Sequence, residues 1–207
     1  MGLFDFFKTK SSIKGEIGYL GLSEWWLSEF SEEERGYIVK TFQPLGSSGE
    51  CLIKGEISSM SQTAISLLSS LAGWFRDEQH RIIAYKMLKK AEEMLEQAKD
   101  VLDIHFFWST KIEIYYRHRD NDSNALSEAV KACIKQIEIA DKAIKAFKKE
   151  YRGNPLPTHK GYEQLAIIKE KDKDFNSAIE LATKALQQGW GGDWQKRIER
   201  CTKKMNK

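Results

Sequence analysis

Residues 158–190 read THKGYEQLAIIKEKDKDFNSAIELATKALQQGW. Apolar residues recur at every third or fourth position in 158–171 and again in 175–188, and Lys-Asp-Lys-Asp separates the two segments. This period predicts two amphipathic helices joined by a tight turn. Small side chains let neighbouring helix backbones approach closely, so the two helices are expected to pack in antiparallel fashion. The residues expected at this contact are Ala166, Ala178, Ala182 and Ala185.

A second part of the chain repeats this spacing. A large residue is followed three residues later by Leu-Ala, and another Ala stands sixteen residues after the large one. Leu68 starts the pattern in one place and Tyr162 starts it in the other. Such spacing is typical of helix hairpins that stack on one another, and stacked hairpins generally bind other molecules through their extended surfaces.

Residues 158–190 resemble a tetratricopeptide repeat, whose pattern is Trp-x2-Leu-Gly-x2-Tyr, then Ala-x3-Phe, Ala and Pro, over a period of about 34 residues. The positions that fit are Tyr162, Leu165, Ala166, Phe175, Ala178 and Ala185. The departures are Lys169, Ala182 and Trp190, which replace an aromatic residue, Phe and Pro. Residues 65–98 resemble a more divergent copy, and residues 103–150 resemble an irregular middle pair of helices.

The resemblance implies an all-α fold, an antiparallel helix-hairpin array like a tetratricopeptide superhelix. In that family the first helix of each repeat lines a concave groove. The implied function is a protein–protein interaction module that binds a peptide or protein segment without catalysis. The resemblance assigns the groove contacts to Lys160, Glu163, Ile167 and Glu170. Two alternatives remain open, a generic helical bundle and a surface that is merely solvated.

The N-terminal part of the chain differs in pattern from the rest. We expect residues 1–57 to form a distinct small segment and residues 58–207 to form the repeat domain, which ends in a capping helix. In the first segment, Ser31 and Glu34 have the spacing of a capping box, which predicts a helix that continues to about residue 42.

Local patterns predict further elements. The pentapeptide Ile-Lys-Gly-Glu-Ile occurs at 13–17 and at 53–57, and the two copies are expected to be short strands that pair. Trp190 and Trp194 flank a Gly-rich connector and are expected to close the end of the last repeat. Apolar periodicity predicts further helices over residues 79–102, 103–117, 125–151 and 194–204.

Composition narrows the class of protein. The chain has 207 residues, 41% hydrophobic and 30% charged residues and a net charge of +3, an ordinary soluble profile. The three cysteines, Cys51, Cys133 and Cys201, are odd in number and widely spaced. They indicate free thiols in a reducing compartment rather than a disulfide framework, and we expect a cytoplasmic protein.

The sequence carries no recognisable catalytic or metal-binding motif. The four histidines lack metal-ligand spacing, and no nucleophile elbow or phosphate-binding loop is present. We therefore predict no enzyme activity, no cofactor and no metal. Cys133 lies on an apolar helix stripe and is expected to be an inert buried thiol. A catalytic pair of Cys133 with His105 or His118 remains open as an alternative.

No segment has the length and polarity of a transmembrane helix. The apolar start, residues 1–8, lacks the features of a signal peptide, and we expect it to pack against the core. Weak contact with a membrane surface is the alternative.

Two basic clusters support a second functional hypothesis. Residues 142–152 and 196–207 are rich in Lys and Arg, and if they share a face they would suit an acidic protein or a nucleic acid. The alternative function is therefore a nucleic-acid-associated regulatory protein. Helix macrodipoles explain part of this clustering without any function, because they favour basic residues at helix C-termini.

Overall fold

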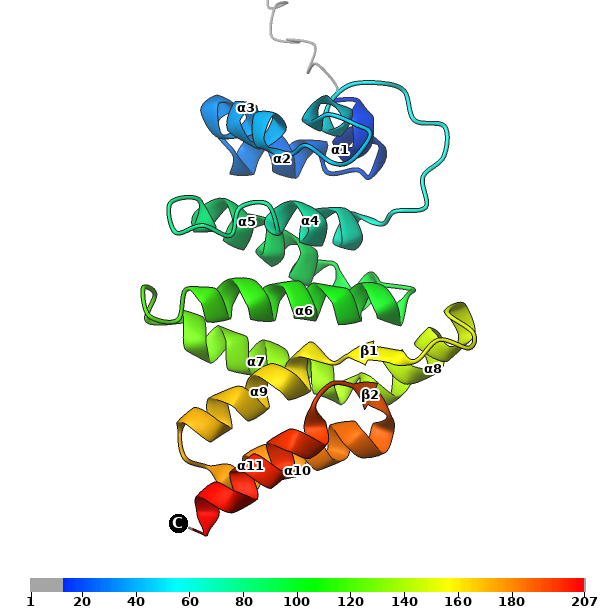
Figure 1. Ribbon diagram of the computed structural model, residues 1–207. Coiled ribbons are helices and arrows are strands. Elements are labelled where there is room, and N and C mark those ends of the chain that lie inside the picture. The colour runs from blue at the N-terminus through cyan, green and yellow to red at the C-terminus, as the bar shows by residue number, and fades with distance from the viewer. Residues whose placement is uncertain (1–12, 207) are drawn as a thin grey trace, which may run out of the picture. The chain divides into compact units, whose positions relative to one another are not determined.

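The computed structural model describes residues 13–206, so the apolar start at residues 1–8 lies outside the described residues. The chain is predominantly helical, which confirms the all-α class (Figure 1). It divides into two compact units, which meet in sequence between Ala64 and Ile65. In residues 13–206, no helix combines the length and apolar character that a bilayer crossing requires.

Within its described part, from residue 13 onward, the first unit contains short α-helices and one 3₁₀ turn: α1 (Gly15–Tyr19), α2 (Ser23–Glu29), α3 (Glu32–Thr41) and η1 (Gly49–Leu52). The capping box before α3 is confirmed. The Glu34 amide donates to Ser31 Oγ at 3.1 Å, and the Ser31 amide donates to Glu34 Oε2 at 2.8 Å. The buried apolar residues of this unit are Ile17, Leu22, Trp26, Phe30, Ile38, Phe42 and Leu52.

The prediction of two short strands in this unit is wrong, although the two pentapeptides do meet. Gly15 begins α1, residues 53–55 form a turn and bend, and residues 56–57 have no regular secondary structure. The Gly15 amide donates to the Gly55 carbonyl at 3.0 Å, and Lys14 forms an ion pair with Glu56. Gly15 has φ +60°, and a Cβ there would overlap the Cys51 carbonyl oxygen. Glycine is therefore needed at this position for close backbone approach rather than for a strand.

The second unit, described as far as residue 206, contains the remaining helices and two very short strands (Figure 1). Its first helix, α4, begins at Ala64, which is the last residue of the first unit. The helices are α4 (Ala64–Ala72), α5 (Arg81–Glu93), α6 (Val101–Arg117), α7 (Ala125–Glu138), α8 (Ala140–Glu150), α9 (Lys160–Lys171), α10 (Phe175–Gln188) and α11 (Trp194–Met205). A 3₁₀ turn, η2 (Leu95–Gln97), follows α5.

Two predicted helices are each too long. The helix predicted over residues 79–102 ends at Glu93, and a new helix begins after Asp100, whose carboxylate accepts a hydrogen bond from the Leu102 amide at 2.8 Å. The helix predicted over residues 125–151 breaks at Ile139. Beyond the break, α8 packs on α6 and on the first strand, whereas α7 packs on α6 and α9. Both halves therefore share α6, but the bend directs α8 to the first strand while α7 remains against α9.

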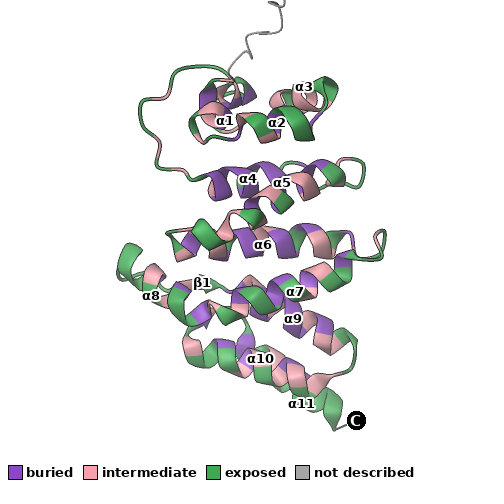
Figure 2. Cartoon of the chain, turned by 180° about the vertical axis from the view of Figure 1, so that it is seen from behind, coloured by how far each residue is buried: buried purple, intermediate pink, exposed green. Residues whose placement is uncertain are grey.

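The helices of this unit pack mainly on their near neighbours in the chain. The most extensive contacts join α6 with α7, α10 with α11, α9 with α10, and α7 with α9. The predicted burial of small residues in α9 and α10 is confirmed, since Ala166, Ala178, Ala182 and Ala185 are all 0% exposed. Figure 2 shows α8 and α11 with mostly exposed residues, because each covers its neighbours with one narrow apolar stripe.

No pattern in the sequence predicts the two strands. β1 (Leu156–Thr158) and β2 (Trp190–Gly191) pair in parallel, with Leu156 opposite Trp190. A Cβ at Gly191 would lie 2.9 Å from the Leu156 carbonyl oxygen, so glycine allows the strands to approach. Trp190 and Trp194, the two indoles expected to close the end of the last repeat, are both buried in one cluster with Ala182 and Ala185 of α10. The Trp190 ring also stacks on His105 of α6, with 5.6 Å between ring centroids.

Candidate functional site

The four residues predicted to line a groove follow one another along α9. Lys160, Glu163, Ile167 and Glu170 are spaced by three, four and three residues, so they lie on one side of the helix. All four are partly exposed, while Leu165 and Ala166 are buried. The side chains at the two ends of this row contact different helices, α6 at one end and α11 at the other.

Lys160 connects α9 with α6. Its Nζ lies 3.4 Å from Glu113 Oε1 on α6 and 3.4 Å from Glu163 Oε2 on its own helix. These contacts are long and partly exposed, so each contributes little to stability. They do place the start of the row beside α6.

Glu170 connects α9 with α11. Its carboxylate lies 3.0 Å from Arg197 Nη1, 2.9 Å from Arg200 Nε and 2.8 Å from Lys204 Nζ. These hydrogen bonds and charges, those of Arg200 first, lower the pKa of Glu170 to about 2. The Glu170 side chain is only 13% exposed, so its charge is already paired within the protein.

A cavity of about 540 Å³ opens beside this row, between α9, the Gly-rich connector and α11. It is lined by Thr158, Glu163, Gly192, Asp193, Trp194, Arg197 and Arg200. Of the predicted residues, Glu163 is in the lining. Glu170 lies behind it and holds the two lining arginines, and Lys160 lies one turn before Glu163. Ile167 is partly exposed and lies outside the lining.

The walls of the cavity carry both signs of charge. Glu163 and Asp193 supply carboxylates, and Arg197 and Arg200 supply guanidinium groups. Trp194 is held rigidly, because it is 2% exposed and its indole N–H donates to the Trp190 carbonyl at 2.7 Å. Arginine binds carboxylates through a planar pair of N–H groups, so the site suits charged groups of a ligand.

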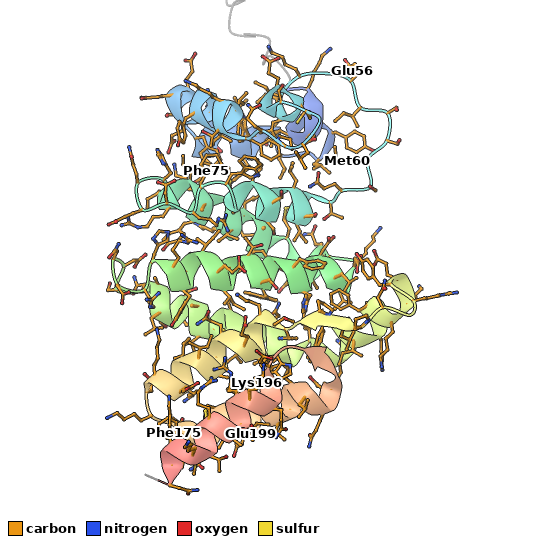
Figure 3. The ribbon with its side chains drawn as sticks, in the orientation of Figure 1. Glu56, Met60, Phe75, Phe175, Lys196 and Glu199 are labelled. Atoms are coloured by element: carbon orange, nitrogen blue, oxygen red, sulfur yellow. The ribbon has the colours of Figure 1, made fainter. Side chains whose placement is uncertain are left out.

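The sequence marks Arg197 and Arg200 only as members of the basic cluster at residues 196–207. Arg197 and Arg200 stand where α11 faces α9. The signal that relates them to the predicted row is that Arg197 follows Glu163 by the same number of positions that separates the starts of α9 and α11. Figure 3 labels Lys196 and Glu199 on α11, and Phe175 near the C-terminal end of that helix. There, Lys204 Nζ lies 5.9 Å from the Phe175 ring centroid.

A buried aromatic cluster lies at the junction of α6, α8, α9 and β2. The rings of His105 and His159 have centroids 5.2 Å apart, and both contact Trp190. Burial lowers the pKa of His105 to about 4 and, with the charge of His105, that of His159 to about 3. Both rings are therefore neutral near pH 7, and they serve the core.

Cys133 is completely buried, and burial raises the pKa of its thiol to about 12. A thiol of this kind is a poor nucleophile, which favours the inert role over a catalytic pair with a histidine. Among residues 13–206, no three His, Cys, Asp or Glu side chains gather as a metal ion would require.

The two basic clusters differ in their pairing. In the C-terminal cluster, Arg197, Arg200 and Lys204 are paired with Glu170, and Lys196 lies 3.2 Å from Asp193. In the α8 cluster the cations are exposed and have no ion pair within the described part of the chain: Lys142, Lys145, Lys148, Lys149 and Arg152. The α8 cluster therefore has more charge free for a partner.

The chain was compared with protein-family models, with curated protein sequences and with solved structures, and none of them matches it.

Proposed function

We propose that this chain is a protein–protein interaction module built as a tetratricopeptide-like array, which binds a peptide or protein segment without catalysis. The binding site is the groove formed by α9 with α6 on one side and α11 on the other. The three free cysteines fit a reducing compartment such as the cytoplasm.

The observation that carries this proposal is a constant offset in sequence between equivalent elements. Lys160 begins α9 and Trp194 begins α11. Leu156 and Trp190, which are partners in the parallel strand pair, are separated by the same number of positions as these two helix starts. This offset matches the tetratricopeptide period of about 34 residues, which supports the interpretation of α11 as the capping helix, standing where the first helix of a following unit would begin.

The chemistry of the cavity defines the kind of segment that fits. Arg200 is 46% exposed on its side chain, so its guanidinium still reaches solvent while it holds Glu170. Glu163 and Asp193 offer acceptors for a Lys or Arg of the ligand. The ligand is therefore an extended segment with both acidic and basic side chains, bound by shape and charge.

Affinity capture from native lysate tests the groove. The bait is the full chain, and the variants are Glu163→Lys and Ile167→Asp, followed by identification of the captured proteins. The matched control is Glu180→Lys, which makes the same charge reversal at an exposed position on α10, outside the groove. We expect the groove variants to lose partners that the control retains. Identical partner sets for all baits would contradict the proposal.

The second candidate function is a nucleic-acid-associated regulatory protein, and the free cations of α8 favour it. Filter binding of labelled RNA and DNA over a salt series tests it. Neutralised phosphates release counterions, so affinity should fall steeply with salt, with losses on the order of 10³-fold between about 50 and 200 mM. Absence of binding at about 50 mM salt would exclude this function.

A further inference from the structure

A second pocket lies outside the proposed groove. Its volume is about 270 Å³, and it opens between α6, the end of α8 and the segment that leads into β1. It is lined by Phe106, Phe147, Tyr151, Asn154, Pro155, Leu156 and Pro157. All of these side chains are aromatic or aliphatic except Asn154, which contributes an amide.

The base of this pocket is fixed by the buried aromatic cluster. The Phe147 ring is 5% exposed and packs edge-to-face on His105 at 5.3 Å and on Trp190 at 5.9 Å between centroids. Phe106 and Tyr151 form its walls and are 47% and 44% exposed. The pocket is therefore preformed, and it presents large exposed aromatic surfaces that water solvates poorly.

Three cations of the α8 cluster adjoin lining residues of this pocket along the chain. Lys148 follows Phe147 in the chain, Arg152 follows Tyr151, and Lys149 lies between them. None of these cations has an ion pair among the described residues, and Glu150 is the one acidic residue between 142 and 152. Exposed cations without an ion pair among the described residues therefore stand next to the pocket's lining residues in the chain.

We propose that this pocket receives one aromatic or large aliphatic side chain of an acidic protein segment, whose carboxylates bind Lys148, Lys149 and Arg152. A pocket of this size holds a single side chain, and a buried apolar anchor with charged surroundings is the usual way in which short segments bind. The proposal is independent of the groove at α9, since none of the lining residues is shared.

Single-stranded nucleic acid also combines aromatic contacts with cations. It requires ring faces on which successive bases can stack along a track. Here the rings converge with Pro155 and Pro157 on one open hollow of about 270 Å³, which accommodates a single inserted side chain better than a series of stacked bases. The observations therefore favour an acidic peptide over a nucleic acid.

Fluorescence anisotropy with the full chain tests this proposal. The probe is a labelled synthetic nonapeptide, Ser-Asp-Glu-Asp-Phe-Asp-Glu-Asp-Ser, and two matched peptides replace Phe by Ser or all acidic residues by their amides. The Phe-containing acidic peptide should bind at least about tenfold more tightly than either matched peptide. Equal affinity for the peptides with Phe and with Ser would overturn the proposal. So would preferential binding of an oligo-uridine probe of similar length.

Variants of the chain locate the binding site. Phe106→Ser and Arg152→Glu should each weaken binding of the nonapeptide by about tenfold. The matched controls are Leu186→Ser, which removes another apolar side chain that is 44% exposed, and Lys184→Glu on the same helix; both should bind like the parent chain. Circular dichroism verifies that each variant is folded. Equal losses of peptide affinity in the controls would overturn the assignment. If the Glu163 variant kept all its partners in affinity capture, the proposed groove would be contradicted, but this pocket assignment would remain intact.

Discussion

The guanidinium of Arg200 donates two parallel hydrogen bonds to the carboxylate of Glu170, each 2.9 Å long. The pair joins the last turns of α9 to the middle of α11. This bidentate geometry is the strongest form of a side-chain ion pair. Arg197 and Lys204 bind the same carboxylate, so one acidic residue fixes most of the length of the terminal helix.

Replacing Glu170 with Gln should therefore loosen α11. The change leaves Arg197 and Arg200 without their anion, and we expect a loss of about 1–2 kcal/mol in unfolding free energy. Urea denaturation measures this loss, and hydrogen exchange should show faster exchange in α11 than elsewhere. Glu199→Gln, an exposed change on the same helix, is the control. If both variants had the stability of the parent chain, the ion-pair network would have no structural role.

Mild acid should destabilise the fold through the buried histidines. In the folded chain the pKa values of His105 and His159 are about 4 and about 3, below the ordinary 6.5. At pH values between 6.5 and these folded-state pKa values, the unfolded state therefore binds more protons than the folded state. The free energy of unfolding should decrease as pH falls from about 6.5 toward 4. Glu170, whose pKa is also lowered, adds a further loss only below about 4.5.

The variant His105→Phe separates the contribution of this histidine to acid sensitivity from that of Glu170. It keeps an aromatic ring against Trp190 but removes one titrating group. Urea denaturation at two values, about pH 7.5 and about pH 4.5, should show a smaller loss in the variant than in the parent chain, by about 1–3 kcal/mol. An unchanged loss would mean that His105 is not a source of the acid sensitivity.

Close packing of α9 on α7 should make Gly161 intolerant of a side chain. A Cβ at Gly161 would lie 2.8 Å from the Cys133 carbonyl oxygen. The Gly161 amide donates to Gln136 Oε1. We expect Gly161→Ala to cost about 1–3 kcal/mol through overpacking. Gly36→Ala in α3 is the matched control, because a Cβ there meets no atom within 4 Å. Helix propensity should make that variant more stable by about 1 kcal/mol, which urea denaturation measures.

The three thiols should differ in reactivity. Cys133 and Cys201 are 0% exposed and Cys51 is partly exposed, and burial raises the pKa of all three. With Ellman's reagent at neutral pH, we expect one slow reaction in the folded chain, at Cys51, and three rapid reactions in urea. The Cys51→Ser variant should lose the folded-state reaction. A second thiol that reacts as fast in the folded variant would contradict the burial of Cys133 or Cys201.

The hairpin of α9 and α10 can be predicted from sequence because local signals agree there. Apolar residues keep a helical period on both sides of Lys-Asp-Lys-Asp, and Asp174 caps α10 by accepting from the Ser177 amide at 3.2 Å. The break at Ile139 cannot be predicted in this way. The apolar stripe of α7 continues through Ala140 and Phe147 with unchanged spacing, so only the tertiary contacts of α8 reveal the bend.

The site can be predicted only in part for a similar reason. Periodicity assigns Glu163 and Glu170 to the outer side of α9, and both side chains are partly exposed there. The arginines that face them come from α11, and their pairing with α9 depends on how α11 packs. The pocket around Phe147 combines residues of α6, α8 and β1, whose proximity no local pattern encodes.

The parallel pairing of β1 with β2 has a consequence for how such a chain can lengthen. Each strand leads directly into a helix, and the paired residues Leu156 and Trp190 stand at corresponding points of successive segments. A duplication of residues 160–193 inserted before Trp194 would reproduce the same strand, the same entry into a helix and the same spacing. Copying this one segment in the gene would therefore lengthen the chain while keeping its pattern of strand followed by helix.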